Sequence, residues 1–131
     1  MKGKGDIIFA RVLKISLSNY LPAEKTAIFR VDFEDFKGRA EFSKEMPLTQ
    51  DAVEKVRELL IMSAARRHYS ADSKGNVNVI IENEAAFINA MNELLARAQR
   101  MIQIIERKDA KSYLNALSNI NMLSIELGGE R

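Results

Sequence analysis

The sequence contains no cysteine, one histidine and only two prolines among its 131 residues. Without cysteine, the chain has no disulfide bonds, no thiolate metal ligands and no cysteine nucleophile. Its single histidine, His68, is too little for a histidine-rich zinc site or for a catalytic triad built on several histidines. We therefore expect no metal site and no cofactor, and we predict that the protein is not an enzyme.

The sequence also lacks a long apolar run and a strong charge of one sign. Lys14, Ser16 and Ser18 interrupt the apolar stretch that begins at Ile7, and no run approaches the about 20 residues of a membrane span. We expect neither a signal peptide nor a membrane segment, and a cytoplasmic protein. The formal net charge is only +2, although the first 30 residues carry six basic and two acidic groups.

Motifs for phosphate binding and for catalysis are missing. The six glycines show neither the P-loop spacing nor the dinucleotide-binding spacing. Carboxylates gather near the middle of the chain, at Asp32, Glu34, Asp35 and Glu41. Because Arg30 and Arg39 lie on the same strand faces, paired charges explain this cluster better than a cation site does.

What the sequence does contain predicts an α+β domain over residues 1–131. Residues 27–34 and 39–43 alternate apolar and charged side chains around the turn Asp35-Phe36-Lys37-Gly38, which predicts an antiparallel hairpin. Residues 7–18 alternate in their second half and favour a strand, although a helix also fits. A helix is expected over 49–68 and a fourth strand over 77–82.

Two helices are expected in the C-terminal part, 83–131, after a sheet-and-helix core over 1–82. Asn83 is a candidate cap for a long helix that ends near Arg107. The last helix is expected to reach Asn119, and residues 120–127 fit either a helix or a strand, because Leu123, Ile125 and Leu127 alternate as in a strand. The predicted order is β-β-β-α-β-α-α, with about four mainly antiparallel strands covered by helices and a C-terminal helical hairpin.

The long helix carries an apolar seam with heptad spacing. The seam consists of Phe87, Met91, Leu94, Ala98, Met101 and Ile105. Such a seam is typical of helices that pack in pairs, and it predicts a homodimer interface. The alternative is that the seam packs on the sheet of its own chain.

Two clusters of basic and aromatic residues are the best candidates for a binding site. The first follows the end of the predicted helix and consists of Arg66, Arg67, His68, Tyr69 and Lys74. The second is the hairpin turn, with Phe36, Lys37 and Arg39. Guanidinium groups bind phosphates and aromatic rings stack on bases. The alternative is structural: cations that complement a helix end, and a phenylalanine that folds back on its hairpin or packs against a neighbouring element.

These clusters favour a non-catalytic protein that binds single-stranded DNA or RNA as a homodimer. Phosphate contacts would make the binding sensitive to salt. The alternative from a different class is a protein–protein assembly or adaptor module that works through its C-terminal helices. The position of the hairpin turn relative to the helix end discriminates between the two, because only the first requires them to form one surface.

Overall fold

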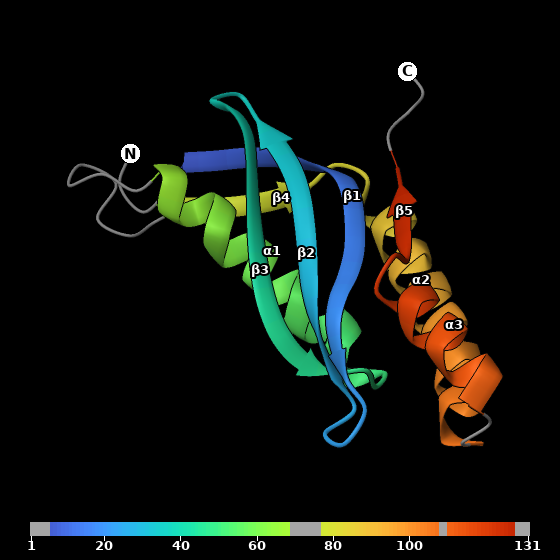
Figure 1. The fold of residues 1–131 in the computed structure, drawn as a ribbon. Helices are drawn as coiled ribbons and strands as arrows, with labels where there is room; N and C mark the ends of the chain where they lie inside the picture. The colour runs from blue at the N-terminus through green and yellow to red at the C-terminus, as the bar shows by residue number, and fades with distance from the viewer. Residues whose placement is uncertain (1–5, 69–76, 108–109, 128–131) are drawn as a thin grey trace.

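The fold was obtained as a computed structural model, which describes residues 6–68, 77–107 and 110–127. The elements follow the order β1-β2-β3-α1-β4-α2-α3-β5 (Figure 1). The predicted α+β class is confirmed, with a sheet that is antiparallel except for one parallel pair. The sheet has five strands, where about four were predicted.

The predicted hairpin is present as β2 (Thr26–Asp35) and β3 (Gly38–Pro47). Its register runs from one end to the other without a shift. The apolar face of β2 is buried, through Ala27, Phe29, Val31 and Phe33. Gly38 has a φ of +114°, a backbone conformation that favours glycine, and this explains a glycine directly after the turn.

The segment 7–18 is a strand, as favoured, within β1 (Asp6–Leu21). Its pairing with β2 shifts at Leu13, so that this residue forms a β-bulge, and shifts again around Asn19, whose φ is 51°. A bulge exchanges the two faces of a strand. The buried positions therefore change phase along β1, which explains why its apolar spacing also fitted a helix.

The second edge of β1 is shared by two strands. The edge of residues 6–10 pairs in parallel with β4 (Val77–Ile81). The edge of residues 14–16 pairs antiparallel with β5 (Ser124–Glu126). A single long strand thus connects the N-terminal and C-terminal parts of the fold, and the bulge at Leu13 lies between its two partners.

Two asparagine side chains complete this edge where neither strand reaches. The amide of Asn83 accepts a hydrogen bond from the Val12 amide at 3.0 Å and donates one to the Val12 carbonyl at 2.9 Å. The side-chain oxygen of Asn121 accepts from the amide of Tyr20 at 2.8 Å. Asn83 occupies the expected position before the long helix, but its side chain makes no cap hydrogen bond, because the amide group is bonded to β1 instead.

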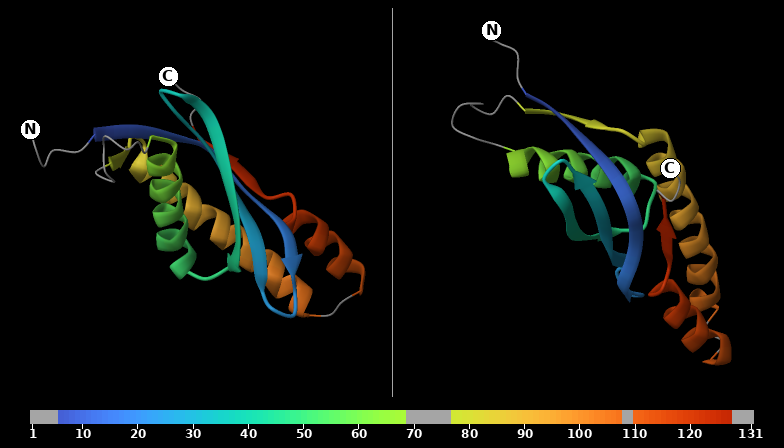
Figure 2. Two further views of the ribbon diagram at one scale, coloured as in Figure 1. Left: turned by 90° about the vertical axis from the view of Figure 1, so that its left-hand side faces the viewer. Right: turned by 90° about the horizontal axis from the view of Figure 1, so that it is seen from above.

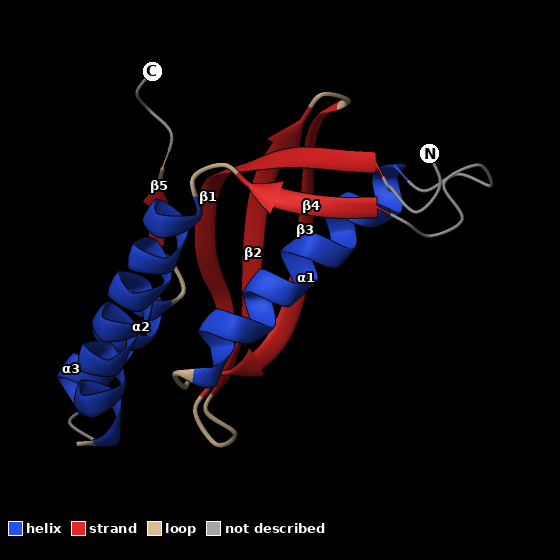
Figure 3. Cartoon of the chain, turned by 180° about the vertical axis from the view of Figure 1, so that it is seen from behind, coloured by secondary structure: helices blue, strands red, loops and turns tan. Residues whose placement is uncertain are grey.

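Helix α1 (Asp51–His68) covers one face of the sheet. Figure 3 shows it across the strands from behind, and Figure 2 shows the same packing from two further directions. Its buried stripe includes Ala52, Val56, Leu60 and Ala64. The opposite face of β1, β2 and β3, which carries the charged residues of the hairpin, faces the viewer in Figure 1 with no described helix over it.

Helices α2 (Glu84–Glu106) and α3 (Ala110–Ile120) form the expected helical pair, but the apolar seam of α2 lies inside the chain. Five of the six seam residues are at most 4% exposed, namely Phe87, Met91, Leu94, Ala98 and Ile105. The sixth, Met101, is half-buried and packs against the same core. The surface expected for a dimer interface is therefore already covered by α3, β1 and β5, and the heptad spacing reflects packing within one chain.

The C-terminal part is continuous with the rest of the fold. Residues 120–127 leave α3 after Ile120 and enter β5, so the strand alternative for this segment is correct. One hydrophobic core extends from Ala10 to Ile120 and takes side chains from both 6–68 and 83–120. None of the described helices is long and apolar enough to cross a membrane.

Candidate nucleic-acid interface

The turn of the hairpin lies against the C-terminal end of α1, so two of the predicted clusters meet. Asp35 is the last residue of β2, and its carboxylate accepts from the backbone amide of Lys37 at 2.9 Å. This local hydrogen bond is the usual reason for aspartate at the start of a turn. The same carboxylate is completely buried, because the last turn of α1 covers it.

Arg67 and His68 both donate to Asp35. The guanidinium of Arg67 makes two hydrogen bonds to the two carboxylate oxygens, each 2.8 Å long. Nε2 of His68 lies 3.0 Å from one of these oxygens. We name Asp35, Lys37, Arg67 and His68 the clasp, since they connect the turn to the helix across more than 30 positions of sequence.

The clasp changes the acidity of its carboxylate. The hydrogen bonds from Arg67 are the main cause that holds the pKa of Asp35 well below its usual value, and His68 and the Lys37 amide act in the same direction. Burial opposes this shift. Asp35 is therefore an anion at neutral pH, and it engages both the Arg67 guanidinium and the His68 ring. Arg67 and His68, predicted as phosphate ligands, serve as internal partners of Asp35 in this structure.

Lys37 is also part of the connection. Its ammonium group donates to the carbonyl of Arg67 at 2.8 Å, one of the last carbonyls of α1. Cations are favourable at this end of a helix because the unpaired carbonyls carry partial negative charge. Lys37 therefore contributes its charge near the surface of the turn while it helps to hold the helix end.

Phe36 is the most exposed aromatic side chain of the region. It is 78% exposed, although its ring lies 4.8 Å from the ring of His68, measured between centroids. His68 supports one side of the ring and leaves the rest open to solvent. The structural alternative for Phe36 is thus met in part: its ring contacts a neighbouring element, the end of α1, while most of the residue is exposed to solvent.

A groove of about 280 Å³ runs beside this ring. Three apolar side chains, Ile7, Phe9 and Phe36, and three charged ones, Arg11, Glu34 and Glu82, line it. We name it the tip groove. Phe9 is 51% exposed and was not predicted as a site residue, because the alternation of β1 gives no sign that one of its faces lacks a cover. Arg11 has no ion pair among the described residues.

The remaining predicted residues are distributed around the turn. Arg39 projects into solvent, with 82% of its side chain exposed and its nearest carboxylate, on Glu34, 4.0 Å away. Arg66 lies in a separate hollow between β3 and α1, beside Phe42 and Ser63. Tyr69 and Lys74 lie outside the described residues, so their positions in the predicted patch are untested.

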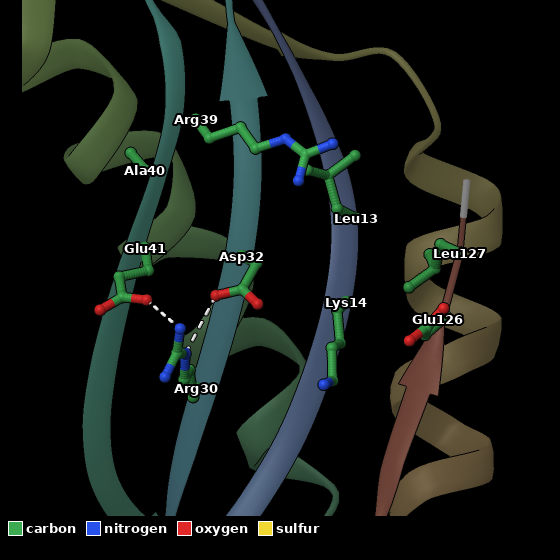
Figure 4. Close-up of a pocket in the computed structure, with 9 residues that line it drawn as sticks. All are labelled: Leu13, Lys14, Arg30, Asp32, Arg39, Ala40, Glu41, Glu126 and Leu127. Atoms are coloured by element: carbon green, nitrogen blue, oxygen red, sulfur yellow. Dashed lines mark hydrogen bonds and ion pairs between the residues drawn. The ribbon is translucent and has the colours of Figure 1, made fainter. Parts of the chain in front are cut away.

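A larger hollow, of about 590 Å³, lies on the open face of the sheet (Figure 4). Arg30 stands between Asp32 and Glu41 and makes an ion pair with each, as the predicted pairing of charges requires. The hollow contains three cations and three carboxylates in all. Its charges compensate one another, and no aromatic ring is among its lining residues, so it lacks the stacking surface of the tip groove.

The described residues contain no group of three or more histidine, aspartate or glutamate side chains that could hold a metal ion. Comparison with known proteins gives no further indication of function: no protein-family model, no curated protein and no solved structure matches the chain significantly. Any assignment therefore depends on the geometry of the tip groove and its surroundings.

Proposed function

We propose that this protein is a non-catalytic binding protein whose ligand is single-stranded DNA or RNA, held at the tip groove. The observation that carries the proposal is that two exposed rings, Phe9 on β1 and Phe36 in the hairpin turn, line one groove together with Arg11. Lys37 and Arg39 add cations at the adjacent turn. Aromatic rings beside cations are the combination by which single-stranded nucleic acids are bound.

Each part of the groove has a role in this proposal. The rings stack on bases, which stabilises binding by about 1–3 kcal/mol per base. Arg11, Lys37 and Arg39 neutralise phosphates and release counterions. The clasp contributes by fixing the turn, because a ring that is already in place loses little conformational entropy when a base stacks on it.

The chain is overall only weakly basic, and this sets the expected affinity. One cation, Arg11, lines the groove beside the carboxylates of Glu34 and Glu82, and Lys37 and Arg39 lie at the adjacent turn. This arrangement supports few phosphate contacts, in contrast to the continuous basic surface of a tight binder. We therefore expect dissociation constants in the micromolar range at low salt. For a single strand, the logarithm of affinity falls by about 0.7 for each phosphate contact per tenfold rise in salt.

The test is fluorescence anisotropy with labelled oligonucleotides of about ten nucleotides, single-stranded and duplex, over a series of salt concentrations. Phe36→Ala is expected to weaken binding about tenfold, and Arg39→Glu is expected to weaken it and to reduce the salt dependence. Leu114→Ala is the matched control for the first variant, since Leu114 is 69% exposed on α3. Arg100→Glu on α2 is the control for charge reversal.

Three results would reject the proposal: no binding at low salt, an affinity independent of salt, or equal effects of the groove variants and their controls. Circular dichroism melting curves of all variants establish that each is folded under the conditions of the assay. Stronger binding to the duplex than to the single strand would also reject it, because stacked bases cannot reach the two rings.

A second candidate function is a module for protein assembly. The surface that supports it is the edge of the sheet at β4, whereas the sequence predicted the seam of α2. The seam of α2 is covered, but Ile80 on β4 and Ile7 on the neighbouring β1 are 46% and 59% exposed. Among the described strands, β4 has only β1 as a neighbour. An apolar strand edge of this kind binds other strands. Light scattering on the wild type and on Ile80→Lys tests it, since concentration-dependent association that disappears in the variant would support assembly at this edge.

A further inference from the structure

Two solvent-accessible carboxylates line the tip groove, Glu34 and Glu82, and a site for phosphates alone needs neither of them. Glu34 is the one that lies opposite a cation of the groove. Glu34 lies on β2 and is register partner both to Arg11 on β1 and to Arg39 on β3. The three side chains form a row across three neighbouring strands on the helix-free face. Glu34 is about half-exposed, and its one ion pair among the described residues, with Arg39, is at the limit of 4.0 Å. Its oxygens therefore retain free acceptor capacity.

A carboxylate in this position weakens the attraction for a polyanion, so its benefit has to come from another part of the ligand. An ionised carboxylate only accepts hydrogen bonds. The exocyclic amino group of a base is a suitable donor, and glutamate accepting from N4 of cytosine is an established pairing. Thymine and uracil present a carbonyl oxygen at the same place. This oxygen carries partial negative charge and cannot donate a hydrogen bond, so it is repelled by the Glu34 carboxylate.

Arg11 supplies the other half of the pattern. A guanidinium only donates hydrogen bonds, and Arg11 lies directly opposite Glu34 on the adjacent strand. An acceptor beside a donor complements the Watson–Crick edge of cytosine, where the amino group is followed by the acceptors N3 and O2. Phe9 and Phe36 line the same groove as this pair, so a base stacked on either ring has its edge close to both charged groups.

We propose that the tip groove selects cytosine over thymine and uracil, with Glu34 accepting from the amino group and Arg11 donating to N3 or O2. This inference rests on the proposed function and adds a base preference to it. Cytosine and thymine are the informative comparison because both are pyrimidines of similar size and stacking area. Their difference in affinity therefore reports on hydrogen bonds at the edge of the base.

The experiment compares oligo(dC) with oligo(dT) of equal length, and oligo(rC) with oligo(rU), by anisotropy at one salt concentration and at slightly alkaline pH. Wild type is expected to bind the cytosine strand about tenfold more tightly. Glu34→Met removes the acceptor with little change of volume, and it is expected to bring the ratio of the two affinities close to one. Binding to oligo(dT) stays the same or increases, because a negative charge has been removed.

Arg11→Met is the second variant, and it is expected to lower both the cytosine preference and the overall affinity. Glu126→Met is the control, since Glu126 is an exposed carboxylate of the other hollow on the same face, and its loss changes the net charge equally. Equal wild-type affinities for oligo(dC) and oligo(dT), or a preference that persists in Glu34→Met, would overturn the base preference while leaving the proposed function intact. Failure of every oligonucleotide to bind would overturn both.

Discussion

The guanidinium of Arg67 and the carboxylate of Asp35 form a two-point ion pair that attaches the hairpin turn to the end of α1. Both hydrogen bonds are 2.8 Å long, and the carboxylate has no exposed surface. The same guanidinium lies 5.9 Å from the centre of the Phe33 ring, whose side chain belongs to the core. The turn that carries Phe36 is thus held by a buried charge pair instead of by its own backbone alone.

Replacement of Asp35 by asparagine is expected to destabilise the protein strongly. The variant keeps the volume of the side chain but leaves Arg67 and His68 without their anion. Loss of one partner of a buried ion pair lowers the free energy of unfolding by about 3 kcal/mol. Chemical denaturation measures this change. The control is Asp32→Asn, whose exposed pair with Arg30 contributes at most about 1 kcal/mol; similar losses in the two variants would contradict the role of the clasp.

The clasp also predicts how stability depends on pH. The pKa of Asp35 is lower in the folded protein than the usual value of about 3.9 in an unfolded chain. Between these two values the unfolded chain binds the proton more readily, so the stabilisation is complete above about pH 4 and is lost as the pH falls further. Denaturation curves for wild type and Asp35→Asn should therefore converge below about pH 4. If the difference in free energy of unfolding between the two proteins stays constant down to pH 3, the ionisation of Asp35 is not its cause.

The sequence predicts the hairpin well because its signal is local. Alternation on both sides of the turn determines which face of β2 is buried, and the acidic start and the glycine end of the turn fix its length. β1 was more ambiguous, because the bulge at Leu13 depends on a change of partner from β4 to β5. Those two strands are separated by more than 40 residues in sequence, and no local pattern records that both pair with β1.

The site was predictable only in part, for the same reason. Phe36 and Arg39 are recognisable because the hairpin alternation puts Phe36 out of phase with the buried face, at a turn that also carries two cations. That Arg67 and His68 would be engaged by Asp35 depends on where the end of α1 lies in the folded chain. The exposure of Phe9 depends on which face of the sheet the helices cover, and composition gives no information about that.

Asn83 provides a test of how β1 is held at its bulge. Asn83→Ala removes the two hydrogen bonds to Val12 and leaves a backbone donor and acceptor in a largely buried place. The expected loss is about 1–3 kcal/mol, and hydrogen exchange at the Val12 amide should become faster. Asn78→Ala, on an exposed position of β4, is the control and should leave both quantities nearly unchanged. Unaltered exchange at Val12 in Asn83→Ala would show that water replaces the amide without loss.

Leu94 distinguishes a seam inside the chain from a seam between two chains. Its side chain has no exposed surface, so Leu94→Ala creates a cavity within one molecule and is expected to lower the free energy of unfolding by about 3 kcal/mol. Because the cavity is internal, this loss should be the same at low and at high protein concentration. If Leu94 were part of a dimer interface, stability would rise with concentration in the wild type, and the variant would reduce that dependence. Leu114→Ala, at an exposed position of α3, is the control and should change stability by less than about 0.5 kcal/mol.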